Sequence, residues 1–137
     1  MEKGRKTELQ KLCLKFRNDL IDLLYSIQTG HPGGSLSCVE IVTTLFFEKM
    51  NIDPQNPKME GRDRFIMSKG HACPTLYMVL AEKGYFDKED LKSLRQIGSH
   101  LQGHPCAHKT PGVELSTGPL GLGLGAGLGI ALGEKLK

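Results

Sequence analysis

RDRFIMSKGHA, residues 62–72, is the part of the sequence that indicates the fold class. Its charged start leads into FIM (65–67), an apolar run too short for a helix and typical of a buried strand. SKGH (68–71) breaks the apolar pattern, and helical periodicity follows it. A strand that ends at a glycine before a helix places its loop at the ligand-binding edge of an α/β sheet. The stretch therefore predicts an α/β fold in which His71 either faces a ligand or caps the next helix.

Hydrophobic periodicity predicts two helices before this stretch. Residues 7–28 carry apolar side chains at steps of three and four, which is typical of an amphipathic helix. That helix must end at TGHPGG (29–34), because this run contains three glycines and a proline. Ser37 and Glu40 match a Ser-x-x-Glu capping box, so we predict a second helix that starts there and continues to residue 49.

The chain around and after the stretch alternates loops and helices. Residues 51–61 predict a surface loop, and residues 72–82 predict a helix that ends at a glycine cap, Gly84. A short, charged, exposed helix is expected over residues 87–96, and residues 100–116 are expected to be irregular. The layout is helix-rich, with one predicted strand and no interdomain linker.

The C-terminal segment combines glycine with apolar residues. Seven glycines lie between Gly118 and Gly133, among Leu, Ala and Ile. Each glycine weakens an isolated helix by about 1 kcal/mol relative to alanine. A helix that is apolar nearly all round is therefore expected to be buried against more protein, with a neighbour close to its backbone.

Composition bounds the class of protein. The chain has 137 residues, 39% of them hydrophobic and 24% charged, which fits one globular domain. No run approaches the roughly 18 apolar residues of a membrane span, and the N-terminal residues lack a signal peptide's apolar core, so a cytoplasmic protein is expected. The net charge of +3 comes from the first 17 residues, and basic residues are not interleaved with aromatics, which argues against nucleic acid. The four cysteines form no CxxC pair and are expected to be reduced.

Two local patterns suggest chemistry but lack the context that would support it. Gly121, Gly123 and Ala126 fit a dinucleotide-type GxGxxA pattern, but the required preceding strand is missing. What remains is a turn at residues 118–121 with approachable N–H groups at a helix start. A second pattern offers acceptable zinc ligands, but its spacing matches no zinc module; its members are His100, His104, Cys106 and His108.

Three histidines share a distinctive context. His31, His71 and His104 each follow a glycine, and two of them lie in Gly-His-Pro. Glycine allows a sharp turn and proline stiffens the next link, so each imidazole is held at the edge of a crevice. A single loop histidine is usually structural, but three of this kind indicate a shared site.

Four motifs together resemble the N-terminal part of transketolase. They are TGHPGGSLS (29–37), RDRFIMSKGHA (62–72), LQGHP (101–105) and STGPLGLGLGAGLGIALG (116–133), and the chain keeps their order and spacing. The sequence is most similar to the N-terminal subunit of two-chain transketolases. A deoxyxylulose phosphate synthase uses the same cofactor but fits less well, because the SKGH run is transketolase-like.

The resemblance implies a fold and an activity. Residues 1–137 would be the N-terminal part of an α/β thiamine diphosphate-binding domain with a parallel sheet. The enzyme would transfer a two-carbon ketol group between sugar phosphates, as in the pentose phosphate pathway. By this resemblance, His31 and His104 would hydrogen-bond the donor's hydroxyls and assist proton transfer, and His71 would contact the cofactor diphosphate.

The glycine-rich turn would complete the cofactor contacts. Thiamine diphosphate would be bound by Gly118, Pro119 and Leu120. The backbones of Gly118 and Leu120 would pack against its aminopyrimidine. Leu122 departs from the family, which commonly has Gln there.

Other parts of the family's site are not in this sequence. The Gly-Asp-Gly…Asn motif that holds Mg²⁺ would follow Lys137, and the glutamate that activates the cofactor belongs to another domain. No metal ligand is therefore predicted in this chain, and a C-terminal transketolase chain or a second copy is the expected partner. A non-catalytic fragment or interaction module is the alternative.

Overall fold

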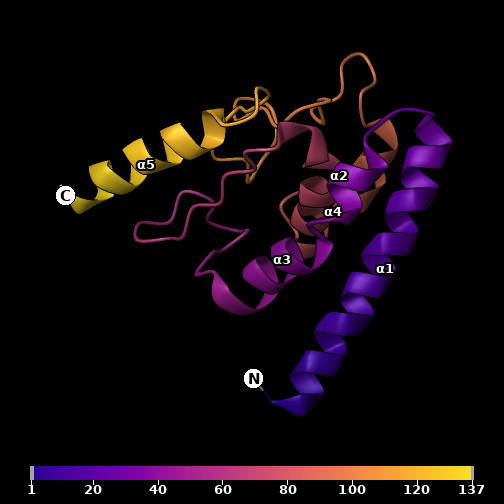
Figure 1. Cartoon of the computed structure of the whole chain (residues 1–137), viewed down its shortest axis with the longest axis horizontal. Helices are drawn as coiled ribbons and strands as arrows, with labels where there is room; N and C mark the ends of the chain where they lie inside the picture. Colours follow the sequence, from indigo (N-terminus) through magenta and orange to yellow (C-terminus); the bar gives the residue numbers. More distant parts are fainter. Residues whose placement is uncertain (1, 137) are drawn as a thin grey trace.

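The protein, described by a computed structural model over residues 2–136, is built from helices and long connections (Figure 1). No strand is found in this range. The elements run in the order α1 (Lys3–Ile27), α2 (Pro32–Leu36), α3 (Val39–Thr44), a π-helical turn η1 (Leu45–Lys49), the 3₁₀ turn η2 (Gly70–Ala72), α4 (Cys73–Lys83), the 3₁₀ segment η3 (Lys88–Ser93) and α5 (Leu122–Lys135).

Helix α1 covers one side of the core. Its buried stripe includes Phe16 and Leu20, which are almost completely enclosed. The helix ends where Gln28 adopts a left-handed backbone with φ 52°. The predicted amphipathic helix is thus confirmed, although it begins four residues earlier than expected.

Helix α4 lies at the centre of the core. Every residue from Cys73 to Ala81 is buried, and α1, α2, α3 and η1 pack around the helix. Gly84 ends it with φ 94° and donates its N–H to two carbonyls of the last turn, as a glycine cap does. The predicted helix and its cap are both confirmed.

Two local predictions are wrong. Residues 65–67 belong to no helix or strand, because a strand needs a hydrogen-bonded neighbour and no segment of residues 2–136 pairs with them. The parallel sheet therefore stays a prediction. The capping box does not form either, since the Ser37 hydroxyl donates to Gly34 O and the Glu40 carboxylate binds Arg17.

The region around residues 29–37 contains a short helix that the sequence did not predict. Pro32 occupies the first position of α2, where its fixed φ suits a helix and its missing N–H is not needed. His31 is the residue immediately before this helix. The glycine- and proline-rich run thus ends one helix and begins another.

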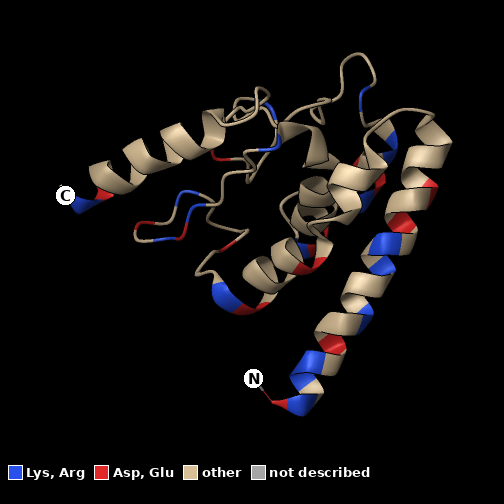
Figure 2. Ribbon diagram, in the orientation of Figure 1, with Lys and Arg blue, Asp and Glu red and all other residues tan. Residues whose placement is uncertain are grey.

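Helix α5 extends away from the other helices (Figure 1). Gly123 is its one buried residue, and it packs against Ser68. Figure 2 shows almost no charge along the helix before its C-terminal end. No helix in the described range is long and apolar enough to cross a membrane.

Candidate active site

Two of the three predicted histidines meet in edge-to-face contact. The ring centroids of His31 and His71 are 5.2 Å apart, with the ring planes at 63°. Gly34 makes room for this pair, since a Cβ there would lie 2.7 Å from His71 Nε2. The turn before α2 and the turn before α4 therefore present their imidazoles together.

The surroundings of His71 lower its pKa from the ordinary value. Removal from water is the main cause, and the charges of His31, Lys69 and His104 add to it. His104, the third predicted histidine, thus acts on His71 through its charge. His71 is therefore held in its neutral form near pH 7, with one ring nitrogen able to donate and the other to accept.

Lys69 ties the His71 turn to α2. Its Nζ donates to Gly34 O at 2.6 Å and to the Ser37 hydroxyl at 2.7 Å. The Thr75 hydroxyl adds a second connection, donating to Ser35 O at 2.8 Å. These bonds fix α2 against the N-terminal end of α4.

Side chains of α4 hold the loop that carries His104. The Tyr77 hydroxyl lies 2.9 Å from Gln102 O and 3.0 Å from His104 O. The Cys73 thiol donates to Gly103 O at 3.2 Å. Burial raises the pKa of Cys73 to about 12 and also raises the pKa of Tyr77. Both groups therefore keep their protons and act as donors to this loop.

The predicted turn at residues 118–120 lies beside the histidines. A Cβ on Gly118 would be 3.9 Å from His104 Cδ2. Thr117 anchors the turn, because its hydroxyl donates to Met67 O at 2.7 Å and its N–H to Pro105 O at 3.3 Å. Gly70 is also required here, since a Cβ would lie 2.7 Å from Thr117 O. The segments before His71, after His104 and before Gly118 are thus fastened together.

The rest of the predicted turn is open. Pro119 and Leu120 are exposed. Within residues 2–136, the backbone N–H groups of Gly118 and Leu120 donate no hydrogen bond. These two groups are available to an acceptor on a ligand.

The four residues of the possible zinc pattern do not form a metal site in the described part of the chain. His100 is turned toward other partners, with Nε2 3.1 Å from Asp90 Oδ2 and its ring against Phe86. In the described part of the chain, no group of three or more His, Cys, Asp or Glu side chains is placed to hold a metal ion.

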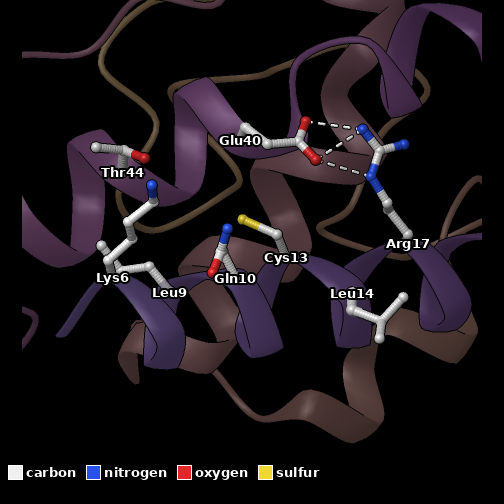
Figure 3. A pocket seen from close by; sticks show the side chains of 8 residues that line it. All are labelled: Lys6, Leu9, Gln10, Cys13, Leu14, Arg17, Glu40 and Thr44. Atoms are coloured by element: carbon white, nitrogen blue, oxygen red, sulfur yellow. Dashed lines mark hydrogen bonds and ion pairs between the residues drawn. The ribbon is translucent and has the colours of Figure 1, made fainter. Parts of the chain in front are cut away.

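An apolar groove lies along the N-terminal helix, away from the predicted site residues. This groove, of about 470 Å³, lies between α1 and α3 and is lined by residues such as Cys13 and Leu14 (Figure 3). Arg17 donates to both oxygens of Glu40 at its edge, at 2.8 and 2.7 Å. None of the predicted site residues lines it.

The sequence of the chain matches a known protein family. Residues 10–137 match the family model described as the transketolase thiamine diphosphate binding domain. This match defines the class as a thiamine diphosphate-binding domain. The chain belongs to the transketolase family.

Relatives support the same assignment and differ in length. One is a subunit of the apulose-4-phosphate transketolase of Phocaeicola vulgatus, to which the chain is 43% identical over 122 residues, covering 89% of this chain and 43% of that protein. The chain is 44% identical over 127 residues to a transketolase from Buchnera aphidicola, covering 92% of this chain and 19% of the relative. The chain thus spans less than half the length of these relatives.

Solved structures share the fold. Transketolase from Leishmania mexicana superposes with a TM-score of 0.85 at 39% identity, over 90% of this chain and 18% of that one. Transketolase from Campylobacter jejuni gives a TM-score of 0.81 at 37% identity, over 90% of this chain and 19% of that one.

Proposed function

We propose that this chain is the N-terminal section of a thiamine diphosphate-dependent transketolase, which transfers a two-carbon ketol group between sugar phosphates. The observation that carries the proposal is the convergence of His31, His71 and His104 beside the Gly118 turn. Family membership supports the cofactor class. The pentose phosphate pathway and a cytoplasmic location are part of the same proposal.

The residues at the cluster fit thiamine diphosphate. The free N–H groups of Gly118 and Leu120 suit acceptor atoms of the cofactor, and Pro119 stiffens the turn between them. His71, held neutral, would donate a hydrogen bond to a diphosphate oxygen. When bound, the cofactor supplies the electron sink that cleavage of a carbon–carbon bond beside a carbonyl requires.

The other two histidines have room to act on the sugar. His31 and His104 are exposed, so each ring can reach a ligand from solvent. An imidazole titrates near neutral pH and can accept or return a proton at a substrate hydroxyl. We therefore assign both the tasks of hydrogen-bonding the donor's hydroxyls and moving their protons.

The site requires further polypeptide. A diphosphate with Mg²⁺ needs oxygen ligands for the metal, and the described residues offer no cluster of carboxylates for it. The open apolar surface of α5 supports a partner as well. We propose that a C-terminal transketolase chain supplies the missing part, alone or in a homodimer of the assembled enzyme. The relative from Phocaeicola vulgatus is named as one subunit of an enzyme, which fits such an arrangement.

A second candidate is a non-catalytic interaction module. The observation in its favour is the same pair of features, an exposed apolar helix and no metal-binding cluster within residues 2–136. It predicts that the chain binds a protein partner but no thiamine diphosphate.

Calorimetric titration with thiamine diphosphate and Mg²⁺ separates the two candidates. The chain is titrated alone and then with a polypeptide that carries the remainder of a transketolase. Binding that appears with the partner, together with ketol transfer from xylulose 5-phosphate, supports the enzyme. Binding in neither case overturns it and leaves the interaction module.

Matched histidine variants test the assigned roles. His104→Gln is expected to lower ketol transfer by about 10²-fold or more, because a positioned acid–base group contributes that much. His108→Gln is the control, since His108 is exposed and is not among the charges that lower the pKa of His71. Equal activity of the two variants would remove His104 from the mechanism.

A further inference from the structure

Arg95 connects the two loops that carry His31 and His104. Its Nη1 donates to the Thr29 hydroxyl at 2.9 Å, two residues before His31. Its Nη2 donates to Gly103 O at 3.4 Å, one residue before His104. A single guanidinium thus spans two segments that are more than 70 residues apart in the sequence.

The loop around Gly103 is shaped to receive this guanidinium. A Cβ at Gly103 would lie 3.1 Å from Arg95 Nε and 3.4 Å from Cζ, so the glycine allows the planar group to pack against the backbone. The backbone N–H of Arg95 donates to Leu101 O at 2.9 Å in the same loop. Side chain and main chain therefore hold the His104 loop together.

Two unfavourable features accompany this arrangement. Arg95 has a left-handed backbone, with φ 65°, which an arginine rarely adopts. Its Nε is buried and has no hydrogen-bond partner within residues 2–136, and such a group is costly to leave unpaired. Strained, over-determined residues concentrate at functional sites, where the surrounding structure maintains them.

We infer that Arg95 is a positioning residue that fixes the spacing of His31 and His104 across the site for the donor sugar. The inference rests on the proposed ketol transfer. Arginine suits this task because its rigid fork reaches two acceptors at once, whereas a lysine ammonium is a point charge on a flexible stem. A small displacement of either imidazole removes the geometry that proton transfer requires.

Arg95→Lys in the assembled enzyme is the first test. We expect kcat/KM for the ketose donor to fall about 10- to 100-fold, the size of effect that a misplacement near 1 Å produces. The affinity for thiamine diphosphate should change little, because the guanidinium of Arg95 hydrogen-bonds to Thr29 and Gly103 and not to the residues proposed to bind the cofactor, within residues 2–136. Arg17→Lys is the matched control, since Arg17 also makes two guanidinium bonds but on the far groove between α1 and α3, and it should keep full activity.

A milder test changes Thr29, the residue whose hydroxyl accepts the hydrogen bond from Arg95 Nη1. Thr29→Val removes the hydroxyl that Arg95 Nη1 contacts and changes an exposed residue, so the fold should persist. Thr29→Ser keeps that hydroxyl and should recover most of the lost kcat/KM. In the Arg95→Lys background Thr29→Val should have almost no further effect, because coupled residues are not additive. Full activity of Arg95→Lys, or additive losses, would overturn the inference.

A spectroscopic measurement separates this inference from the proposed function. In nuclear magnetic resonance spectra of the full chain, Arg95→Lys should shift the ring resonances of His31 and His104. The ring resonances of the exposed His108 should not shift. If these shifts occur and the wild-type assembly has no ketol transfer, the proposed function fails and the coupling of the loops stands. Unmoved resonances of His31 and His104 would refute the coupling even in an active enzyme.

Discussion

Helices α4 and α5 are both rich in apolar residues, yet one is enclosed and the other is exposed. All nine residues from Cys73 to Ala81 are buried in α4, while α5 buries only Gly123 and leaves leucines such as Leu124 and Leu128 77% and 63% exposed. The difference lies in the neighbours, because six other elements pack against α4, whereas α5 extends away from the other helices (Figure 1). Apolar composition alone therefore does not predict whether a helix is buried. Burial also depends on which other elements of the chain pack against it.

Truncation of a leucine should be costly in α4 and almost without effect in α5. Leu80→Ala should lower the free energy of unfolding by about 2–5 kcal/mol, because Leu80 is fully enclosed and the change leaves a cavity. Leu128→Ala, the matched change on α5, should stay within about 0.5 kcal/mol in the isolated chain. Urea denaturation followed by circular dichroism measures both. Similar losses for the two variants would mean that α5 is packed in solution.

The helical half of the fold could be predicted from the sequence. Periodicity predicted α1, and the glycine after Lys83 predicted the end of α4. Periodicity could not show whether residues 65–67 form a strand, because a short apolar run looks the same whether or not another strand pairs with it. The exposure of α5 could not be judged from its apolar composition either, because composition does not say whether another element packs against it.

The sequence pointed to the three histidines of the candidate site. It did not point to the residues that hold their loops in place. His31, His71 and His104 stood out because each follows a glycine. Tyr77 and Arg95 did not, since they act on backbone carbonyls or on a hydroxyl distant in sequence. A hydrogen bond to a carbonyl leaves no pattern, because every residue has that acceptor.

Two glycines of α5 differ in how closely other atoms approach them. A Cβ at Gly123 would lie 2.6 Å from Ser68 Cα, so Gly123→Ala should push the first turn of α5 away from Ser68, at a cost of about 1–3 kcal/mol. Gly125 has nothing within 4 Å, so Gly125→Ala should instead stabilise the helix by up to about 1 kcal/mol. Amide hydrogen exchange across α5 measures both effects. Faster exchange in Gly125→Ala would contradict the view that this face is open.

The exposed leucines of α5 should be visible to a dye. Leu124 and Leu128 lie one helical turn apart and are both exposed. Changing both to lysine should reduce binding of anilinonaphthalene sulfonate while leaving the stability of the isolated chain within about 0.5 kcal/mol. Changing the buried α4 pair Leu76 and Leu80 in the same way should unfold the chain. Unchanged dye fluorescence in the α5 variant would mean that these leucines are covered.

The smallest effect concerns the turn that enters α4. Because the folded chain lowers the pKa of His71, the unfolded chain binds this proton more tightly, and stability rises with pH in that window. The folded chain should lose no stability from this group above the ordinary pKa of 6.5, and the loss should be complete below the pKa of His71 in the folded chain. Nuclear magnetic resonance titration should therefore give His71 a midpoint below 6.5. Lys69→Gln should raise that midpoint only in part, because burial is the larger cause and remains, and a full return to the ordinary value would show instead that charge outweighs burial at this end of α4.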